Sequence, residues 1–94
     1  MDSDFEWDEQ KNRENREKHA VGFEDAQRAF QDPHRLIIRD SLHRDNEERW
    51  FCVGDIKTGI VTVRFTMRDS RIRIFGAGYW RKMRRLYYRR KGQP

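Results

Sequence analysis

A chain of 94 residues has room for one small domain, and we expect residues 1–94 to form a single domain. Charged residues make up 39% of the chain against a usual share of about 25%, and 21 Lys and Arg outnumber 16 Asp and Glu to give a net charge of +5. Leu, Ile, Val and Phe together number only 19, which predicts a small hydrophobic core. These figures exclude a multidomain enzyme and favour a polyanion as the partner.

The charge is unevenly distributed along the chain. Residues 1–32 carry a net charge of −5, residues 33–70 carry +1, and residues 71–94 carry +9 without a single acidic residue. We therefore expect phosphate groups to be attracted to the C-terminal end. Cys52 has no second cysteine for a disulfide, and no apolar stretch approaches the roughly 20 residues needed to cross a bilayer. We expect a cytoplasmic protein with no membrane contact.

The first predicted elements are a short edge strand around Phe5 and Trp7 and a helix from Asp8 to His19, with Asp8 as its N-cap. The helical segment contains no apolar residue, so ordinary hydrophobic packing cannot hold it in place. Its polar face is either buried with hydrogen bonds or lines a binding surface. Four polar side chains share one side of this helix: Lys11, Asn15, Lys18 and His19.

A second helix and a sheet are predicted next. Phe23, Ala26, Ala29 and Phe30 recur at helical spacing, and Asp32-Pro33 ends that helix. Strand-like segments joined by short polar connections then predict an antiparallel meander. Gly76-Ala77-Gly78 closes the last strand, and a C-terminal helix follows, so the fold class is α+β. The predicted strands are Leu36–Arg39, Arg49–Gly54, Gly59–Met67 and Arg71–Phe75, and the last helix is Tyr79–Arg90.

Alternation along the strands separates an apolar face from a basic one. Val61, Val63, Phe65 and Met67 share one face of their strand, and Arg64 lies on the other. In the next strand Ile72 and Ile74 lie opposite Arg71 and Arg73. If the apolar sides pack on the helices, Arg64, Arg71 and Arg73 form an open, basic surface that can bind phosphate. The alternative is a solvated polar face of the kind that antiparallel sheets often have.

The segment from Gly78 to Arg85 interleaves aromatic and basic residues. Aromatic rings stack on bases and arginines bind phosphate, so this pattern favours single-stranded RNA over duplex. We expect one of Tyr79 and Trp80 to be buried in the core and the other to be exposed. The candidate RNA-binding residues are Arg71, Tyr79, Lys82, Arg84 and Arg85.

Metal and cysteine chemistry find little support in the sequence. His19, His34 and His43 lack zinc-ligand spacing, Cys52 lies inside a predicted strand, and no glycine-rich phosphate loop is present. We therefore expect no metal and no cofactor. A metal-free ribonuclease is compatible with the sequence because RNA supplies its own nucleophile, the 2′-hydroxyl. Such an enzyme needs a base, an acid and fixed positive charge.

The N-terminal half resembles the BrnT family of bacterial toxins, whose pattern reads FEWD..K...N..KH.V.FE.A. The later segments Glu47-Glu48-Arg49 and Arg71-Ile72-Arg73-Ile74 fit the family too, so the resemblance runs in order along nearly the whole chain. The residues that carry the N-terminal pattern are Phe5-Glu6-Trp7-Asp8, Lys11, Asn15, Lys18-His19, Val21, Phe23-Glu24 and Ala26.

The resemblance implies a RelE-like fold and a ribonuclease that arrests translation. It also implies neutralisation by an antitoxin with a ribbon-helix-helix DNA-binding domain, in a 2:2 complex that binds promoter DNA through the antitoxin. Many members read Ser-Ala-Arg after the last strand, where this chain reads Gly76-Ala77-Gly78, so the arginine's role passes to Arg81 or Trp80 holds the base differently. The candidate catalytic residues are then Lys18, His19, Glu24, Arg64, Arg73, Trp80 and Arg81.

Several readings stay open on the sequence alone. His19 is a candidate general base, and its alternative is a helix-end histidine that hydrogen-bonds to the N-terminal strand. The whole chain is either a metal-independent endoribonuclease, a non-catalytic RNA- or ribosome-binding module, or a structural subunit whose basic surface binds an acidic protein.

Overall fold

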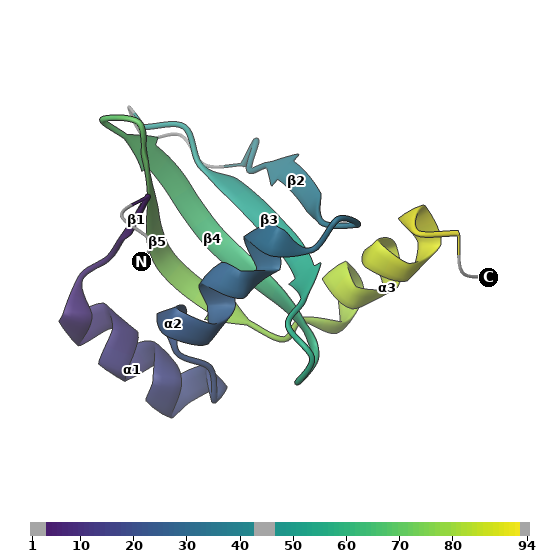
Figure 1. The fold of residues 1–94 in the computed structure, drawn as a ribbon, viewed down its shortest axis with the longest axis horizontal. Coiled ribbons are helices and arrows are strands. Elements are labelled where there is room, and N and C mark those ends of the chain that lie inside the picture. Colours follow the sequence, from purple (N-terminus) through teal and green to yellow (C-terminus); the bar gives the residue numbers. More distant parts are fainter. Residues whose placement is uncertain (1–3, 43–46, 93–94) are drawn as a thin grey trace.

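The fold is a five-stranded sheet with helices on both faces. The computed structural model describes residues 4–42 and 47–92. The chain forms, in order, β1 (Phe5–Glu6), α1 (Glu9–His19), α2 (Phe23–Ala26), the 3-10 helix η1 (Gln27–Gln31), β2 (Leu36–Arg39), β3 (Trp50–Asp55), β4 (Ile60–Arg68), β5 (Arg71–Gly78) and α3 (Arg81–Arg90). Figure 1 shows α1 and α2 at one side of the sheet and α3 at its far end. None of the helices within the described residues is long and apolar enough to cross a membrane.

The strand order is β1-β5-β4-β3-β2, which makes the sheet mixed. Strands β2 to β5 pair antiparallel in sequence order, as predicted, but β1 pairs parallel with β5. The predicted meander is therefore confirmed for β2 to β5, but the parallel β1 means that the sheet as a whole is not a simple meander. The backbone amide of Ile72 donates to the carbonyl of Asp4 (2.8 Å) beside the two paired residues of β1. β1 has only two residues and pairs with residues 67 positions further along the chain, so the local sequence does not predict its partner strand.

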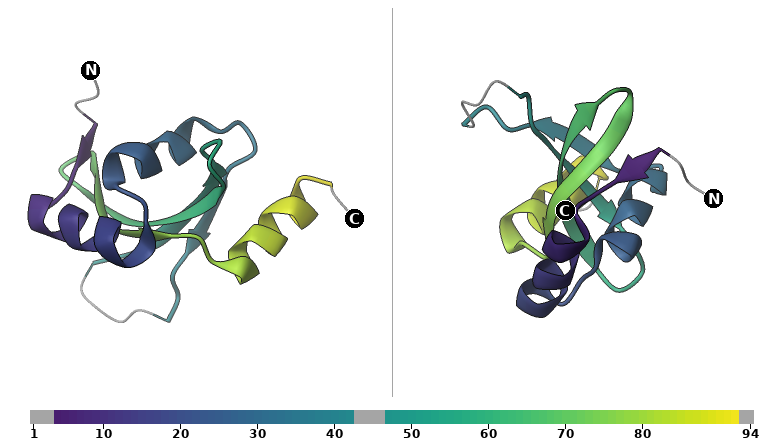
Figure 2. Two further views of the ribbon diagram at one scale, coloured as in Figure 1. Left: turned by 90° about the horizontal axis from the view of Figure 1, so that it is seen from below. Right: turned by 90° about the vertical axis from the view of Figure 1, so that its left-hand side faces the viewer.

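Two hydrophobic clusters hold the layers together, one on each face of the sheet. Figure 2 shows the helices that cover these faces, α2 on one and α3 on the other. On the α2 side, Phe23 and Ala29 are fully buried against Val61 and Val63 of β4. On the α3 side, the buried Tyr87 packs near Val53 and Ile60, with Met83 partly buried beside it. The predicted apolar face of β4 is confirmed except at its end, where Met67 is exposed.

Helix α1 is held by buried amides instead of apolar side chains. Asn12 is fully buried, its Oδ1 accepts from the amide of Phe23 (2.8 Å), and its Nδ2 donates to Glu24 (3.0 Å). This contact caps the start of α2, where Gly22 offers no side chain. Asn15 donates to the carbonyls of Val21 and Ala77 (2.9 Å each) and accepts from the amide of Ala77 (3.1 Å). Of the predicted polar face, Asn15 is buried and hydrogen-bonded, whereas Lys11, Lys18 and His19 are exposed and line a hollow, so each alternative holds for part of the face.

Several boundaries differ from the predictions. The segment predicted as one helix of about two turns divides into α2 and η1. Strand β5 continues three residues further than expected, through Gly76-Ala77-Gly78, and α3 begins at Arg81 instead of Tyr79. The extension follows from the pairing of these three residues with β4, and Asn15 bonds to both backbone groups of Ala77 on the other edge, where β1 has ended.

Asp32 links α3 to the rest of the fold through hydrogen bonds of its carboxylate. Its carboxylate accepts from the hydroxyl of Tyr87 (2.5 Å) and from the backbone amides of Asp55 and His34 (2.8 Å each). Burial acts to raise the pKa of this carboxyl, but the three hydrogen bonds outweigh burial and leave the pKa below its usual range. Burial and the same contact raise the pKa of Tyr87.

Tyr87→Phe is expected to lower the free energy of unfolding at pH 7 by about 1.5–3 kcal/mol, because the charged Asp32 loses a buried donor. The folded-state pKa of Asp32 lies below its unfolded value, so this stabilisation is complete above about pH 4 and is lost as the pH falls through the folded-state pKa. Urea unfolding at pH 7 and near pH 3 measures the difference, with Tyr88→Phe on the exposed side of α3 as the control. If Tyr87→Phe lowered the free energy of unfolding equally at both pH values, the hydrogen bond to the charged Asp32 would not be the cause of the loss.

Candidate functional site

A cleft between α1 and β5 is the first of three hollows that Trp80 lines. It has a volume of about 310 Å³ and is basic, with Glu14 as the one acidic residue among those that line it. We call it the α1–β5 cleft. Its lining comes from α1, from the middle of β4, from the end of β5 and from the residue before α3: Lys11, Glu14, Asn15, Lys18, His19, Arg64, Phe75, Gly76, Ala77 and Trp80.

Lys18 and His19 reach the cleft from the last turn of α1. The buried Asn15 fixes the rotation of the helix, and residues three and four positions further on share its side. His19 is exposed, and its ring lies edge-on to Trp80 with 6.0 Å between centroids. Within residues 4–42 and 47–92 no hydrogen bond joins His19 to β1, so the predicted helix-end role finds no support there.

Arg64 is held over the floor of the cleft by an aromatic ring. Its guanidinium carbon lies 5.1 Å from the centroid of Phe75, and that of Arg49 lies 4.6 Å from the same ring. Phe75 is the extra residue of a β-bulge, since Arg64 pairs with Gly76 whereas Phe65 pairs with Ile74. Bulges often turn a side chain toward a functional site. Alternation after Ile74, which lies in the core on the α2 side, places Phe75 on the α3 side of the sheet, where its ring meets Arg64.

Trp80 forms the wall opposite His19. A side chain at position 78 would meet the indole of Trp80, because a Cβ there would lie 3.0 Å from Cζ2. The indole therefore fills the space that a residue-78 side chain would enter, so Trp80, not Arg81, takes that place in the cleft. The prediction that one of Tyr79 and Trp80 is buried is wrong, because they are 42% and 37% exposed.

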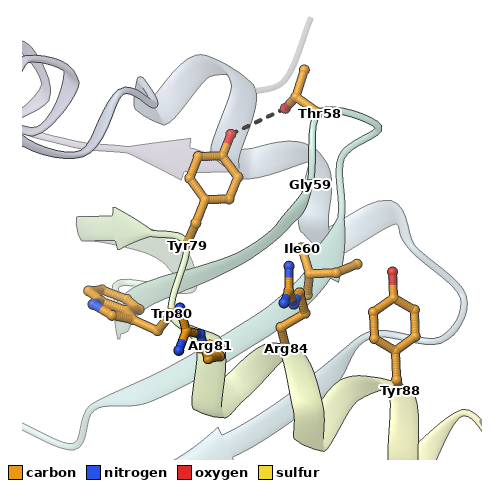
Figure 3. A pocket seen from close by; sticks show the side chains of 8 residues that line it. All are labelled: Thr58, Gly59, Ile60, Tyr79, Trp80, Arg81, Arg84 and Tyr88. Carbon is orange, nitrogen blue, oxygen red and sulfur yellow. Dashed lines mark hydrogen bonds between the residues drawn. The ribbon is translucent and has the colours of Figure 1, made fainter.

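The second hollow lies on the other side of Trp80, between the β3–β4 connection and α3, and we call it the α3 hollow. Figure 3 shows Tyr79 pointing to Thr58, and Arg84 and Tyr88 rising from one side of α3. The predicted residues Tyr79, Arg81 and Arg84 all line it. A third, more apolar groove brings Lys82 beside Arg64 and Trp80. Arg85 is exposed on α3 outside these hollows.

Residues 7–84 match the family model described as the ribonuclease toxin BrnT of type II toxin-antitoxin systems. The chain belongs to the BrnT family. The match includes all of α1, the bulge and Trp80, and it ends within the first turns of α3, before Tyr87 and Tyr88. No curated protein matches the chain. As a member of this family, the chain is a toxin of a type II toxin–antitoxin system with ribonuclease activity.

Glu24, a candidate catalytic residue of this BrnT chain, is not among the residues that line the α1–β5 cleft. Its carboxylate accepts from Asn12 (3.0 Å) and lies 3.9 Å from Arg16. A hydrogen bond from its own backbone amide, helped by these two neighbours, holds the pKa of Glu24 below its usual range against the opposing effect of burial. The geometry makes Glu24 a connector between α1 and α2.

Arg71 and Arg73 are likewise apart from the cleft. Both are half-buried and lie against Glu6 of β1, at 3.6 Å and 3.3 Å, and Arg71 also donates to the carbonyl of Phe5 (2.8 Å). The expectation that both lie on an open surface beside the C-terminal helix is wrong, because Glu6 of β1 pairs with both and α3 contacts β3 and β4. Their charge is partly neutralised within the protein.

Sequence reasoning missed several residues of both hollows. Lys11 shares the predicted polar side of α1 with Lys18 but is not among the candidate site residues, and Glu14, one turn before Lys18, could have been added by helical spacing. Strand alternation places Phe75 opposite Ile74, on the face that carries Arg64, so the same pattern could have added it. Tyr88 follows Arg84 by four residues on α3 and could have been found the same way, but Thr58 and Gly59 come from a distant connection.

Within residues 4–42 and 47–92, no three His, Cys, Asp or Glu side chains gather as a possible metal site, and His43 lies outside the described residues. Cys52 is fully buried in β3. Burial raises the pKa of its thiol to about 12, so the nucleophilic thiolate is scarce at neutral pH.

Proposed function

We propose that this chain is a metal-independent endoribonuclease that cleaves RNA in the α1–β5 cleft and so inhibits translation and growth. The observation that carries the proposal is the meeting of Lys18 and His19 with Arg64 and Trp80 in one basic cleft. These four residues come from three separate parts of the chain. Together they offer a proton-transfer group, two cations and an aromatic surface, which a ribonuclease needs in one place.

The chemistry needs no external nucleophile. The 2′-oxygen of one nucleotide forms a bond to the adjacent phosphorus, the bond from phosphorus to the 5′-oxygen of the next nucleotide breaks, and a cyclic 2′,3′-phosphate and a 5′-hydroxyl result. One group must take the proton from the 2′-hydroxyl and another must give a proton to the leaving oxygen. We assign one of these transfers to His19, because imidazole can both accept and donate a proton near neutral pH.

Arg64 and Lys18 supply the positive charge for the phosphate. The guanidinium of Arg64 is already oriented by Phe75, so little reorganisation is needed when negative charge builds up on the phosphate oxygens. Trp80 offers a partly exposed indole on which a base next to the scissile phosphate can stack. Glu24 and Asn12 act indirectly in this proposal, by holding α1 in position.

The test is RNA cleavage by the purified chain in excess EDTA. We expect single-stranded RNA to be cut at an unchanged rate with the chelator, and mass spectrometry to show cyclic 2′,3′-phosphate and 5′-hydroxyl ends. Loss of cleavage with EDTA and its return with added Mg²⁺ would contradict the metal-free mechanism. RNA binding without cleavage in either condition would select the non-catalytic RNA- or ribosome-binding module.

We further propose that residues 1–94 act in the cytoplasm as one RelE-like toxin domain, neutralised by a ribbon-helix-helix antitoxin in a 2:2 complex that binds promoter DNA. The type II family supports an antitoxin partner, and the basic α3 gives an acidic segment a surface to cover. Expression of the chain alone should arrest growth, and co-expression of the short protein encoded beside it should restore growth.

A further inference from the structure

The α3 hollow has the features of a nucleotide site. It has a volume of about 430 Å³ and is lined by three aromatic rings and two arginines, with no acidic residue (Figure 3). Arg81, Arg84 and Tyr88 lie three and four residues apart, which places all three on one side of α3. Aromatic faces bind bases of any sequence, and arginines bind the phosphates that join them.

One wall of the hollow is held rigidly. The hydroxyl of Tyr79 lies 3.2 Å from Oγ1 of Thr58, and its ring packs on Gly59 so closely that a Cβ there would lie 3.0 Å from Cε1. The φ of +153° at Gly59 is also one that other residues rarely adopt. Tyr79 and Tyr88 nevertheless stay 42% and 41% exposed, so their rings are open to a ligand. A fixed, open ring loses little freedom when a base stacks on it.

The positive charge around the hollow favours the binding of an anion. The first turn of α3 holds Arg81 and Lys82 and no acidic residue, although the positive end of a helix dipole favours acids. Trp80, at the N-cap, makes no side-chain hydrogen bond to the helix start. A phosphate there would relieve the repulsion between the cations and accept from the free amides of the first turn.

Trp80 lines both hollows, so an RNA strand lying in the α1–β5 cleft reaches the α3 hollow by passing one side chain. We propose that the α3 hollow is a second nucleotide subsite, which holds a base flanking the scissile phosphate against Tyr88 and Tyr79 and its phosphate at Arg84. This proposal rests on the proposed function, because it takes the cleft to be the place of cleavage. It makes the substrate a single strand that extends beyond the cut, since a base that is paired and stacked in a duplex does not offer its face to an aromatic side chain.

The experiment measures binding, so it does not require cleavage. Fluorescence anisotropy compares wild type and Tyr88→Ala on a series of single-stranded 2′-O-methyl oligoribonucleotides, each lacking the base at one position. Removal of the base that occupies the hollow should weaken wild-type binding about tenfold, which is typical of one lost stacking contact. Tyr88→Ala should bind intact RNA about tenfold more weakly than wild type does. Removing the same base should then not weaken the binding of Tyr88→Ala any further. Tyr88→Phe should behave as wild type.

Arg89→Ala, on another side of α3, is the matched control and should leave the abasic profile unchanged. An abasic profile that is the same in wild type and Tyr88→Ala would overturn the subsite. If RNA is cleaved and the profile does not depend on Tyr88, the subsite alone fails. If the profile depends on Tyr88 but no RNA is ever cleaved, the proposed nuclease fails and the nucleotide subsite stands.

Discussion

Arg64→Ala is expected to lower kcat/KM on single-stranded RNA by about 10²-fold or more. The Arg64 guanidinium is held in place on the floor of the α1–β5 cleft, with its carbon 5.1 Å from the centroid of the Phe75 ring. Lys18 and His19 line the same cleft. Removing one preorganised donor to developing negative charge typically costs about 10²–10³-fold in rate. Initial rates on a fluorogenic oligoribonucleotide in excess EDTA measure the effect.

Two further variants separate geometry from simple charge. Arg64→Lys keeps the charge but loses the planar fork that lies over Phe75, so it should recover only part of the activity. Arg89→Ala removes the same charge from the exposed side of α3 and should stay within about twofold of wild type. Arg64→Ala with full activity and an unchanged melting temperature would remove Arg64 from the mechanism.

Local patterns predict most of the fold because most of its elements are held by local or alternating contacts. β2 has the predicted bounds, since Leu36 and Ile38 alternate with side chains on the opposite face and Asp32-Pro33 ends the helical segment before it. The predicted N-cap is confirmed, because the side chain of Asp8 accepts a hydrogen bond from the backbone amide of Gln10. The parallel β1 and the bulge at Phe75 could not be predicted, because both depend on contacts between residues far apart in the chain.

The candidate site divides in the same way. Lys18 and His19 could be placed together from helical spacing, and Arg64 from strand alternation. Arg73 satisfies the same alternation but is paired with Glu6, a partner that lies 67 residues away and carries no pattern pointing to it. The exposure of Tyr79 also depends on the distant Gly59, and that of Trp80 on the nearby Gly78, since each glycine lets a ring lie close to the backbone. Sequence therefore indicates which residues can bind RNA, and tertiary pairing decides which of them stay available.

Asn15→Ala is expected to lower the free energy of unfolding by about 2–4 kcal/mol, out of a total of about 5–10 kcal/mol for a domain of this size. Three buried backbone groups lose their partner at once: the carbonyls of Val21 and Ala77 and the amide of Ala77. Because α1 has no apolar residue, no hydrophobic contact of its own replaces them. Urea unfolding followed by circular dichroism measures the loss, with a midpoint shift of about 2 M.

Asn15→Asp tests whether the amide group itself is required. A carboxylate can still accept from the amide of Ala77 (3.1 Å), but it places negative charge against two carbonyl oxygens, so it should destabilise at least as much as alanine. Glu17→Ala, on the exposed side of α1, should change stability by no more than about 0.5 kcal/mol. A deficit below about 1 kcal/mol for Asn15→Ala would mean that something other than this buried amide holds α1, and with it Lys18 and His19, against β5.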